Sequence, residues 1–131
     1  MRLEQKFAST IYKQVSTYRE KTPDEKIYKQ YGSMAYTLPI LVRTAGLAQA
    51  LSFVESKSKK RESYAQLLSH LAEVVMDDKD ANLAERSRNA YLQEYIYLTR
   101  RTMLALRWYK RFAESVLDIK PTDKPDDEGG E

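Results

Sequence analysis

The amino-acid sequence predicts an all-α protein, a compact antiparallel bundle of about five to six helices with a long C-terminal helix. Three observations predict this fold class. Apolar residues recur three or four positions apart along nearly the whole chain, without strand-like alternation. The 131 residues contain no internal repeat and suit one core. Hydrophobic residues make up 42% and charged residues 31%, as in a globular domain.

The N-terminal third predicts two helices. An apolar stripe indicates a first helix of about five turns: Leu3, Phe7, Ile11, Val15 and Tyr18. Thr22 then has the residue type of an N-cap, and Pro23 suits the first helical position. The second helix begins there, carries Ile27, Tyr31 and Met34, and is expected to end or kink at Pro39.

The middle of the chain predicts a buried third helix, from about Pro39 to Ser56. It is apolar nearly all the way round, so other helices must surround it. The apolar run in residues 30–54 is nevertheless too short and too polar to cross a membrane, and the N-terminus has no signal-peptide pattern. Gly46 costs about 1 kcal/mol relative to alanine within a helix, which predicts a close backbone approach there.

The rest of the chain is predicted to hold, in order, a basic connector (57–61), a fourth helix with its stripe from Tyr64 to Val75, a short helix (Leu83 to Arg88), a long last helix (about Asn89 to Asp118) and an acidic tail. Prolines and glycines in the tail predict disorder. The predicted division is therefore a helical bundle domain, residues 1–119, and a disordered acidic tail, residues 120–131.

Signatures of catalysis are missing from the sequence. The chain has no cysteine, which excludes thiol chemistry and zinc–thiolate sites, and it has no glycine-rich phosphate loop. Its single histidine, His70, lies off the apolar stripe of its helix, so we expect a solvent-facing or interface histidine. Asp77, Asp78 and Asp80 lack EF-hand spacing and are expected to be a solvated helix end. We therefore expect no enzyme activity, no cofactor and no metal; a small nuclease that depends on His70 is a disfavoured alternative.

The formal charge of +3 hides a strong asymmetry. Residues 1–119 carry a net charge of +6, whereas residues 120–131 carry −3. A basic body indicates a polyanionic partner such as nucleic acid, although many helical domains are mildly basic without one.

The last helix carries the clearest basic pattern. Its core face is predicted to comprise Leu98, Thr102, Ala105, Tyr109, Phe112, Ala113 and Val116. On the opposite face lie Arg100, Arg107 and Arg111, flanked by Arg101 and Lys110. Guanidinium groups spaced along a rod can contact successive phosphates; a merely solubilising face is the alternative. Met103 and Leu104, beside the arginines, are candidates for a protein interface, and the connector residues Lys57, Lys59, Lys60 and Arg61 are weaker phosphate candidates.

Ten tyrosines and one tryptophan raise the question of base stacking. Tyr18, Tyr31, Tyr64 and Tyr109 share stripes with aliphatic residues, so we expect them to be core residues. Trp108 lies at the border of the core face and is expected to seal the bundle.

Two sequence blocks resemble a known family. Pro39, Gly46-Leu47, Gln49, Leu51 and Phe53 fit the pattern P-x-L-x-x-x-x-G-L-x-Q-x-L-x-F, with Tyr31 and Ser33 upstream, and Trp108 to Ala113 fits W-x-K-R-F-A. Both blocks, in this order, are similar to the small helical subunit of type III-B CRISPR effector (Cmr) complexes. With their surroundings they cover about residues 27–54 and 91–117, close to half the chain.

The resemblance implies a cytoplasmic, non-catalytic subunit that stacks with copies of itself and with other subunits along guide RNA and target RNA. It carries over Arg43, Lys110 and Arg111 as candidate RNA contacts. Two alternatives stay open: a helical adaptor whose arginines meet an acidic protein, and the type III-A small subunit.

Overall fold

The computed structural model describes residues 1–123, which form six helices and no strand, so the predicted all-α fold is confirmed. The rest of the predicted acidic tail, 124–131, lies outside the described residues. In chain order the helices are α1 (Leu3–Lys21), α2 (Glu25–Ala45), α3 (Leu47–Ser58), α4 (Glu62–Met76), α5 (Leu83–Asn89) and α6 (Leu92–Ser115). Within residues 1–123, no helix is long and apolar enough to span a membrane.

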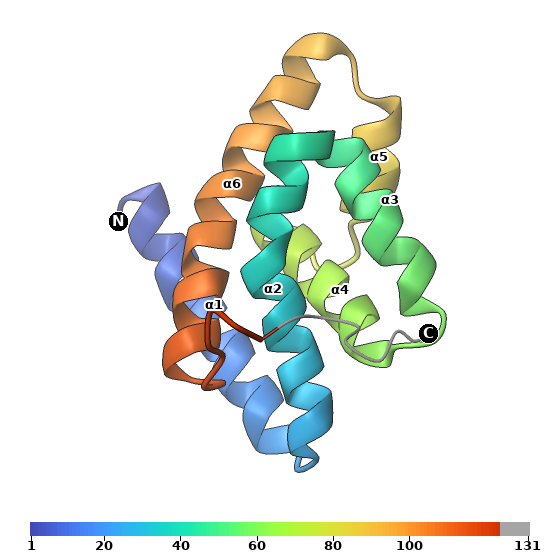
Figure 1. Cartoon of the computed structure of the whole chain (residues 1–131). Helices are drawn as coiled ribbons and strands as arrows, with labels where there is room; N and C mark the ends of the chain where they lie inside the picture. The colour runs from blue at the N-terminus through green and yellow to red at the C-terminus, as the bar shows by residue number, and fades with distance from the viewer. Residues whose placement is uncertain (124–131) are drawn as a thin grey trace.

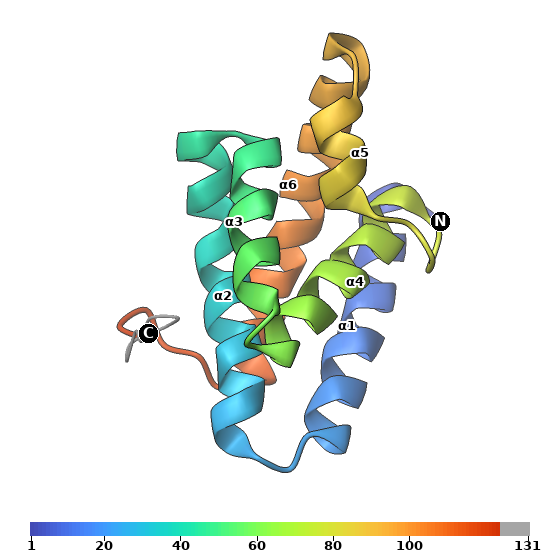
Figure 2. The same cartoon turned by 90° about the vertical axis from the view of Figure 1, so that its right-hand side faces the viewer.

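Helix α6 organises the bundle. It packs against α1 and α2, and α4 closes the same core from behind (Figure 1). Turned by 90°, α2 and α3 form a hairpin on one side of the molecule and α1 lies on the other (Figure 2). Because its neighbours surround only part of α6, one face of this long helix is left for solvent.

The boundary between α2 and α3 differs from the sequence prediction. Pro39 neither ends the second helix nor starts the third; it lies buried inside α2, which continues to Ala45. Gly46, expected in mid-helix, has φ +90° and ψ 160°, where the chain breaks between the two helices. That conformation is open almost only to glycine, so the helix ends where glycine allows the chain to turn. Burial of Leu38, Pro39 and Val42 offsets the hydrogen bond that proline removes.

The start of α2 is also two residues later than predicted. Thr22 closes α1, and Asp24 is the N-cap of α2, where its carboxylate accepts the Lys26 N–H at 2.9 Å. Aspartate is as good an N-cap as threonine or better, and here it follows Pro23.

Of the two glycines that the structure describes, Gly32 has the closer neighbour, although a Cβ atom on Gly46 would also lie only 3.2 Å from the Tyr95 hydroxyl. After α6 ends, the chain folds back so that Leu117 and Ile119 are buried. A Cβ atom on Gly32 would lie only 2.6 Å from Cγ1 of Ile119, so this segment packs directly on the α2 backbone.

Candidate nucleic-acid interface

The outer face of α6 displays most of the predicted basic residues. Its inner face is buried through Leu98, Thr102, Ala105, Leu106, Tyr109 and Ala113, largely as the sequence predicts. Phe112 and Val116, also predicted for the core, are only half-buried at its edge. Arg100, Arg107, Lys110 and Arg111 are exposed. The fold therefore presents these four cations to solvent on one rigid helix.

Three of these cations line a surface groove, here called the α6 groove. Its volume is about 600 Å³ and its lining residues are Glu4, Arg107, Trp108, Lys110, Arg111 and Glu114. Arg107 and Arg111 form no ion pair or hydrogen bond with any residue in the part of the chain that the structure describes. Both guanidinium groups are thus available to a phosphate, although two carboxylates at the rim reduce the local positive charge.

Lys110 is held in place by an aromatic ring. Its Nζ atom lies 4.8 Å from the centroid of Tyr36 on α2. A cation over a ring face is attracted by about 0.5–1 kcal/mol at an exposed site. The contact positions Lys110 beside the groove and leaves its ammonium hydrogens accessible.

Aromatic rings support the α1 side of the groove. Trp108 is half-buried and stacks on Phe112 with ring centroids 5.7 Å apart, and Phe112 meets Tyr12 of α1 edge-on at 5.3 Å. This placement agrees with the expected sealing role of Trp108. Most of the other predicted aromatic core is present as well, since Tyr31, Tyr64 and Tyr109 are fully buried and Tyr18 is half-buried.

Arg101 has a different environment from the other cations of α6. Its Nε atom donates a hydrogen bond of 2.8 Å to the carbonyl of Val75 near the end of α4. Its guanidinium also lies 5.2 Å from the ring centroid of Phe7 and 5.4 Å from that of Tyr97. Carbonyls at a helix C-terminus attract cations, so Arg101 joins α6 to α4 and α1.

The second-rank candidates lie elsewhere. Arg43 is exposed in the last turn of α2. Lys59 and Lys60 are exposed, while Lys57 and Arg61 are half-buried, with their charges over the rings of Phe53 (5.3 Å) and Tyr64 (5.8 Å). This connector joins α3 to α4, across the molecule from the outer face of α6 (Figure 2). The structure therefore does not bring the connector and the α6 groove together.

The protein-interface candidates lie further toward the start of α6. Met103 and Leu104 are half-buried at the edge of the core. Sequence reasoning missed the more exposed apolar residues before them, Leu92, Ile96 and Tyr97. A signal was present, because Ile96 precedes Met103 by seven residues and so lies on the same face.

Of the two environments expected for His70, solvent-facing or at an interface, the structure excludes the first. It is half-buried, and its Nδ1 atom is hydrogen-bonded to the hydroxyl of Tyr31 at 2.7 Å. Burial lowers the pKa of His70 from 6.5 to about 4, so the ring is neutral at pH 7. His70 is shielded from solvent because α1 and α2 approach a second side of α4, where Tyr18 and Tyr31 contact the imidazole.

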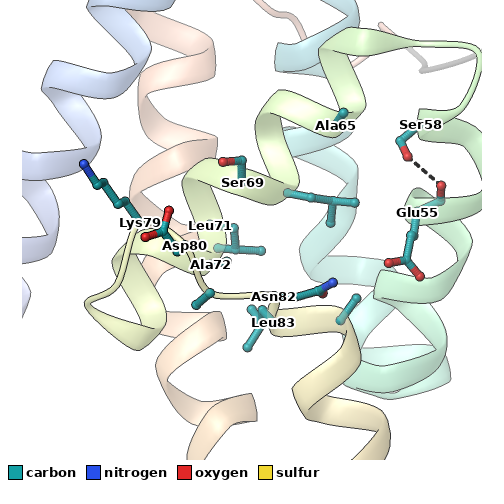
Figure 3. A pocket seen from close by; sticks show the side chains of 13 residues that line it. Glu55, Ser58, Ala65, Ser69, Leu71, Ala72, Lys79, Asp80, Asn82 and Leu83 are labelled. Carbon is teal, nitrogen blue, oxygen red and sulfur yellow. Dashed lines mark hydrogen bonds between the residues drawn. The ribbon is translucent and has the colours of Figure 1, made fainter.

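A second groove, of about 400 Å³, lies between α3, α4 and the loop before α5 (Figure 3). Much of its lining consists of small side chains such as Ala65, Ser69 and Ala72. Two of its polar residues are engaged locally: Glu55 pairs with Arg88 at 2.9 Å, and the Ser58 hydroxyl donates to the Glu55 carbonyl at 2.6 Å. Residues 1–123 also contain no group of three or more His, Asp or Glu side chains placed to hold a metal ion.

Comparisons with known proteins agree with the two motif blocks. The family model described as CRISPR-associated protein (Cas_Cmr5) matches residues 3–116. A curated relative, CRISPR system Cmr subunit Cmr5 of Thermus thermophilus, is 44% identical over 89 residues, which are 68% of this chain and 76% of the relative. The crystal structure of a CRISPR-associated Cmr5 family protein, also from Thermus thermophilus, matches with a TM-score of 0.76 and 38% identity, over 88% of this chain and 98% of that one. These matches favour the type III-B resemblance over the type III-A alternative.

Proposed function

Because the chain belongs to the Cmr5 family of CRISPR-associated proteins, we propose that it is a non-catalytic structural subunit of an RNA-guided Cmr effector complex in the cytoplasm. It stacks with copies of itself and with the backbone subunits along the guide and target RNA. Its basic face contacts RNA phosphates, while pairing between guide and target supplies the sequence specificity.

The α6 groove is the observation that carries the RNA-facing part of this proposal. Arg107 and Arg111 are four residues apart on one side of a helix, so their guanidinium groups follow one line. Neither is neutralised by an ion pair within residues 1–123. Each guanidinium can bind a phosphate through two parallel hydrogen bonds, and Lys110 adds a third positive charge.

This binding mode needs no reading of base edges. A straight α-helix meets a regular phosphate backbone at a fixed spacing, which suits a subunit that must accept any guide sequence. The isolated chain brings few such contacts, so its affinity for RNA is weak by itself. Several stacked copies on one RNA raise the overall affinity through effective concentration.

A protein adaptor with an acidic partner is the second candidate function. Met103 and Leu104 favour it, because apolar side chains near the arginines suit a protein interface better than a phosphate backbone. The two functions differ in what accompanies the chain in its host.

Co-purification from the native host tests the proposal. A tagged full-length chain is isolated under mild salt, and the sample is divided and treated with or without ribonuclease before size-exclusion chromatography. Co-elution with several Cmr subunits and with RNA supports the proposal. Co-elution with a single acidic protein, free of RNA, contradicts it and supports the adaptor.

A further inference from the structure

Exposed apolar side chains gather at the start of α6. Among residues 1–123, ten large hydrophobic side chains are exposed, and four of them fall within seven residues: Tyr91 (89%), Leu92 (72%), Ile96 (41%) and Tyr97 (56%). In both views the first turns of α6 project beyond the bend between α2 and α3 (Figures 1 and 2). A cluster of this kind on a projecting helix is unlike the scattered apolar residues of an ordinary surface.

These residues continue into the predicted protein-interface residues. At about 100° per residue, Leu92, Ile96 and Met103 lie within about 40° of one another on the outer side of α6. Tyr97 and Leu104 form a second line beside them, and Arg100 lies between the two lines. We call these five apolar residues the apolar strip.

Arg100 gives the strip its charge. It is exposed and has no hydrogen bond or ion pair with any other residue described. An arginine surrounded by apolar side chains at an interface must meet a negative charge when it is covered, because an unpaired charge is costly to desolvate. Four of the five side chains around it, all but Tyr97, have no hydrogen-bond donor for a phosphate, so a protein is the better source of the acid.

We propose that the apolar strip is the docking surface for an acidic amphipathic helix of another subunit of the complex. That helix lays its apolar side chains along the strip and places a carboxylate against Arg100. The outer face of α6 is thereby divided into a protein-binding N-terminal half and an RNA-binding C-terminal half. This inference rests on the proposed membership of the Cmr complex and adds a partner chemistry to it.

A second copy of this chain does not supply the required surface. In residues 1–123, α1 and α2 each expose two large hydrophobic side chains at least nine residues apart, and α3 exposes one. Pairing of two strips would also bring arginines of like charge together, which costs free energy. The occupant with complementary charge is therefore a different protein.

The test measures incorporation of the full-length chain into a complex reconstituted from the other Cmr subunits of its host without RNA. The variants Ile96→Glu and Arg100→Glu are compared with matched controls, Ile40→Glu and Lys13→Glu. Ile40 is 54% exposed on α2, and Lys13 is exposed on α1. Circular dichroism checks that every variant keeps its helical content.

Both strip variants should weaken incorporation at least about tenfold, because a charge is placed against apolar groups or against a like charge, whereas the controls change it less than about twofold. Unchanged incorporation of Ile96→Glu and Arg100→Glu would overturn the proposal. The proposal would also be overturned if the variants lost self-association as isolated chains but were still incorporated normally, since the strip would then bind a second copy. If the variants lower only RNA affinity, the strip belongs to RNA. If the wild-type chain itself fails to join the complex, the proposed function is contradicted and the docking surface with it.

Discussion

His70 and the side chains around it make the folding stability of the protein depend on pH. Its pKa is lowered to about 4 by burial, and its Nδ1 atom is hydrogen-bonded to Tyr31. Nearby, Gln14 donates to the His70 carbonyl at 3.2 Å and accepts from the Tyr109 hydroxyl. Burial also raises the pKa values of Tyr31 and Tyr109, so both phenols stay protonated.

Acidification should therefore destabilise the protein through this histidine. Between pH 6.5 and 4 the unfolded chain binds a proton at His70 and the folded chain does not, so the free energy of unfolding falls as the pH falls. From pH 7 to pH 5 the expected loss is about 1–2 kcal/mol, allowing for partial exposure. Urea unfolding at each pH measures it.

The variant His70→Asn is the control, because asparagine keeps a hydrogen-bonding group but does not titrate. His70 is the only histidine of the chain, so no other side chain has an ordinary pKa near 6.5. The variant should be less stable at pH 7 and show a much flatter dependence from pH 7 to 5. An equally steep dependence in the variant would show that other groups cause it.

For the arginines of α6, the sequence predicts well whether a side chain is exposed but predicts poorly which residues it contacts. The exposed positions of Arg107 and Arg111 follow from helical periodicity alone. The contacts of Arg101 with Val75 and Phe7 do not, because they depend on where α4 and α1 cross α6. For the same reason, the sequence did not predict the contact of His70 with Tyr31.

Among the helices, the connection between α2 and α3 depends on Gly46. Its φ of +90° and ψ of 160° are strained for any residue with a Cβ atom, and that atom would lie 3.2 Å from the Tyr95 hydroxyl. The same hydroxyl accepts the Ala48 N–H at 3.0 Å and so satisfies a free donor at the start of α3.

Replacing Gly46 with alanine should destabilise the protein by about 1–3 kcal/mol, because the backbone must hold a conformation that alanine avoids. The midpoint of urea unfolding measures the change. A glycine in mid-helix would behave in the opposite way, since alanine would then stabilise it by about 1 kcal/mol. A more stable Gly46→Ala variant would thus contradict the observed break between α2 and α3.

Elements with a strong apolar stripe were predicted closely, and those without one were not. α1 and α4 match the predicted segments within a few residues, because their stripes are bounded by cap residues or charged loops. The segment around Pro39 and Gly46 is apolar on all sides, so no periodicity marks where one helix ends. There the buried proline stays within a helix, and the glycine conformation decides the boundary.

For the molecule as a whole, charge is divided between the bundle and the acidic tail. The bundle, residues 1–119, carries +6 and the tail −3. Helix α6, which carries the cations of the α6 groove, and the connector between α3 and α4 lie on different sides of the molecule (Figure 1).

Removal of residues 120–131 should raise RNA affinity at low salt, because the hypothesis is that the acidic tail competes weakly with RNA for the basic surface. The gain should disappear at about 1 M salt, where the screening length falls to about 3 Å. Fluorescence anisotropy with labelled RNA at two salt concentrations measures both effects. Equal affinity of the full and shortened chains at low salt would count against competition.

The most direct test of the RNA-facing role is the salt dependence of RNA binding by the reconstituted Cmr complex, with wild-type chain or with Arg107→Glu/Arg111→Glu. Lys13→Glu is the control. Two lost phosphate contacts per copy should reduce the size of the slope of log affinity against log salt by about 1.4 for each copy on single-stranded RNA, and the affinity should fall as well. If the double variant assembles normally and keeps the wild-type slope and affinity, the α6 groove is not the RNA surface.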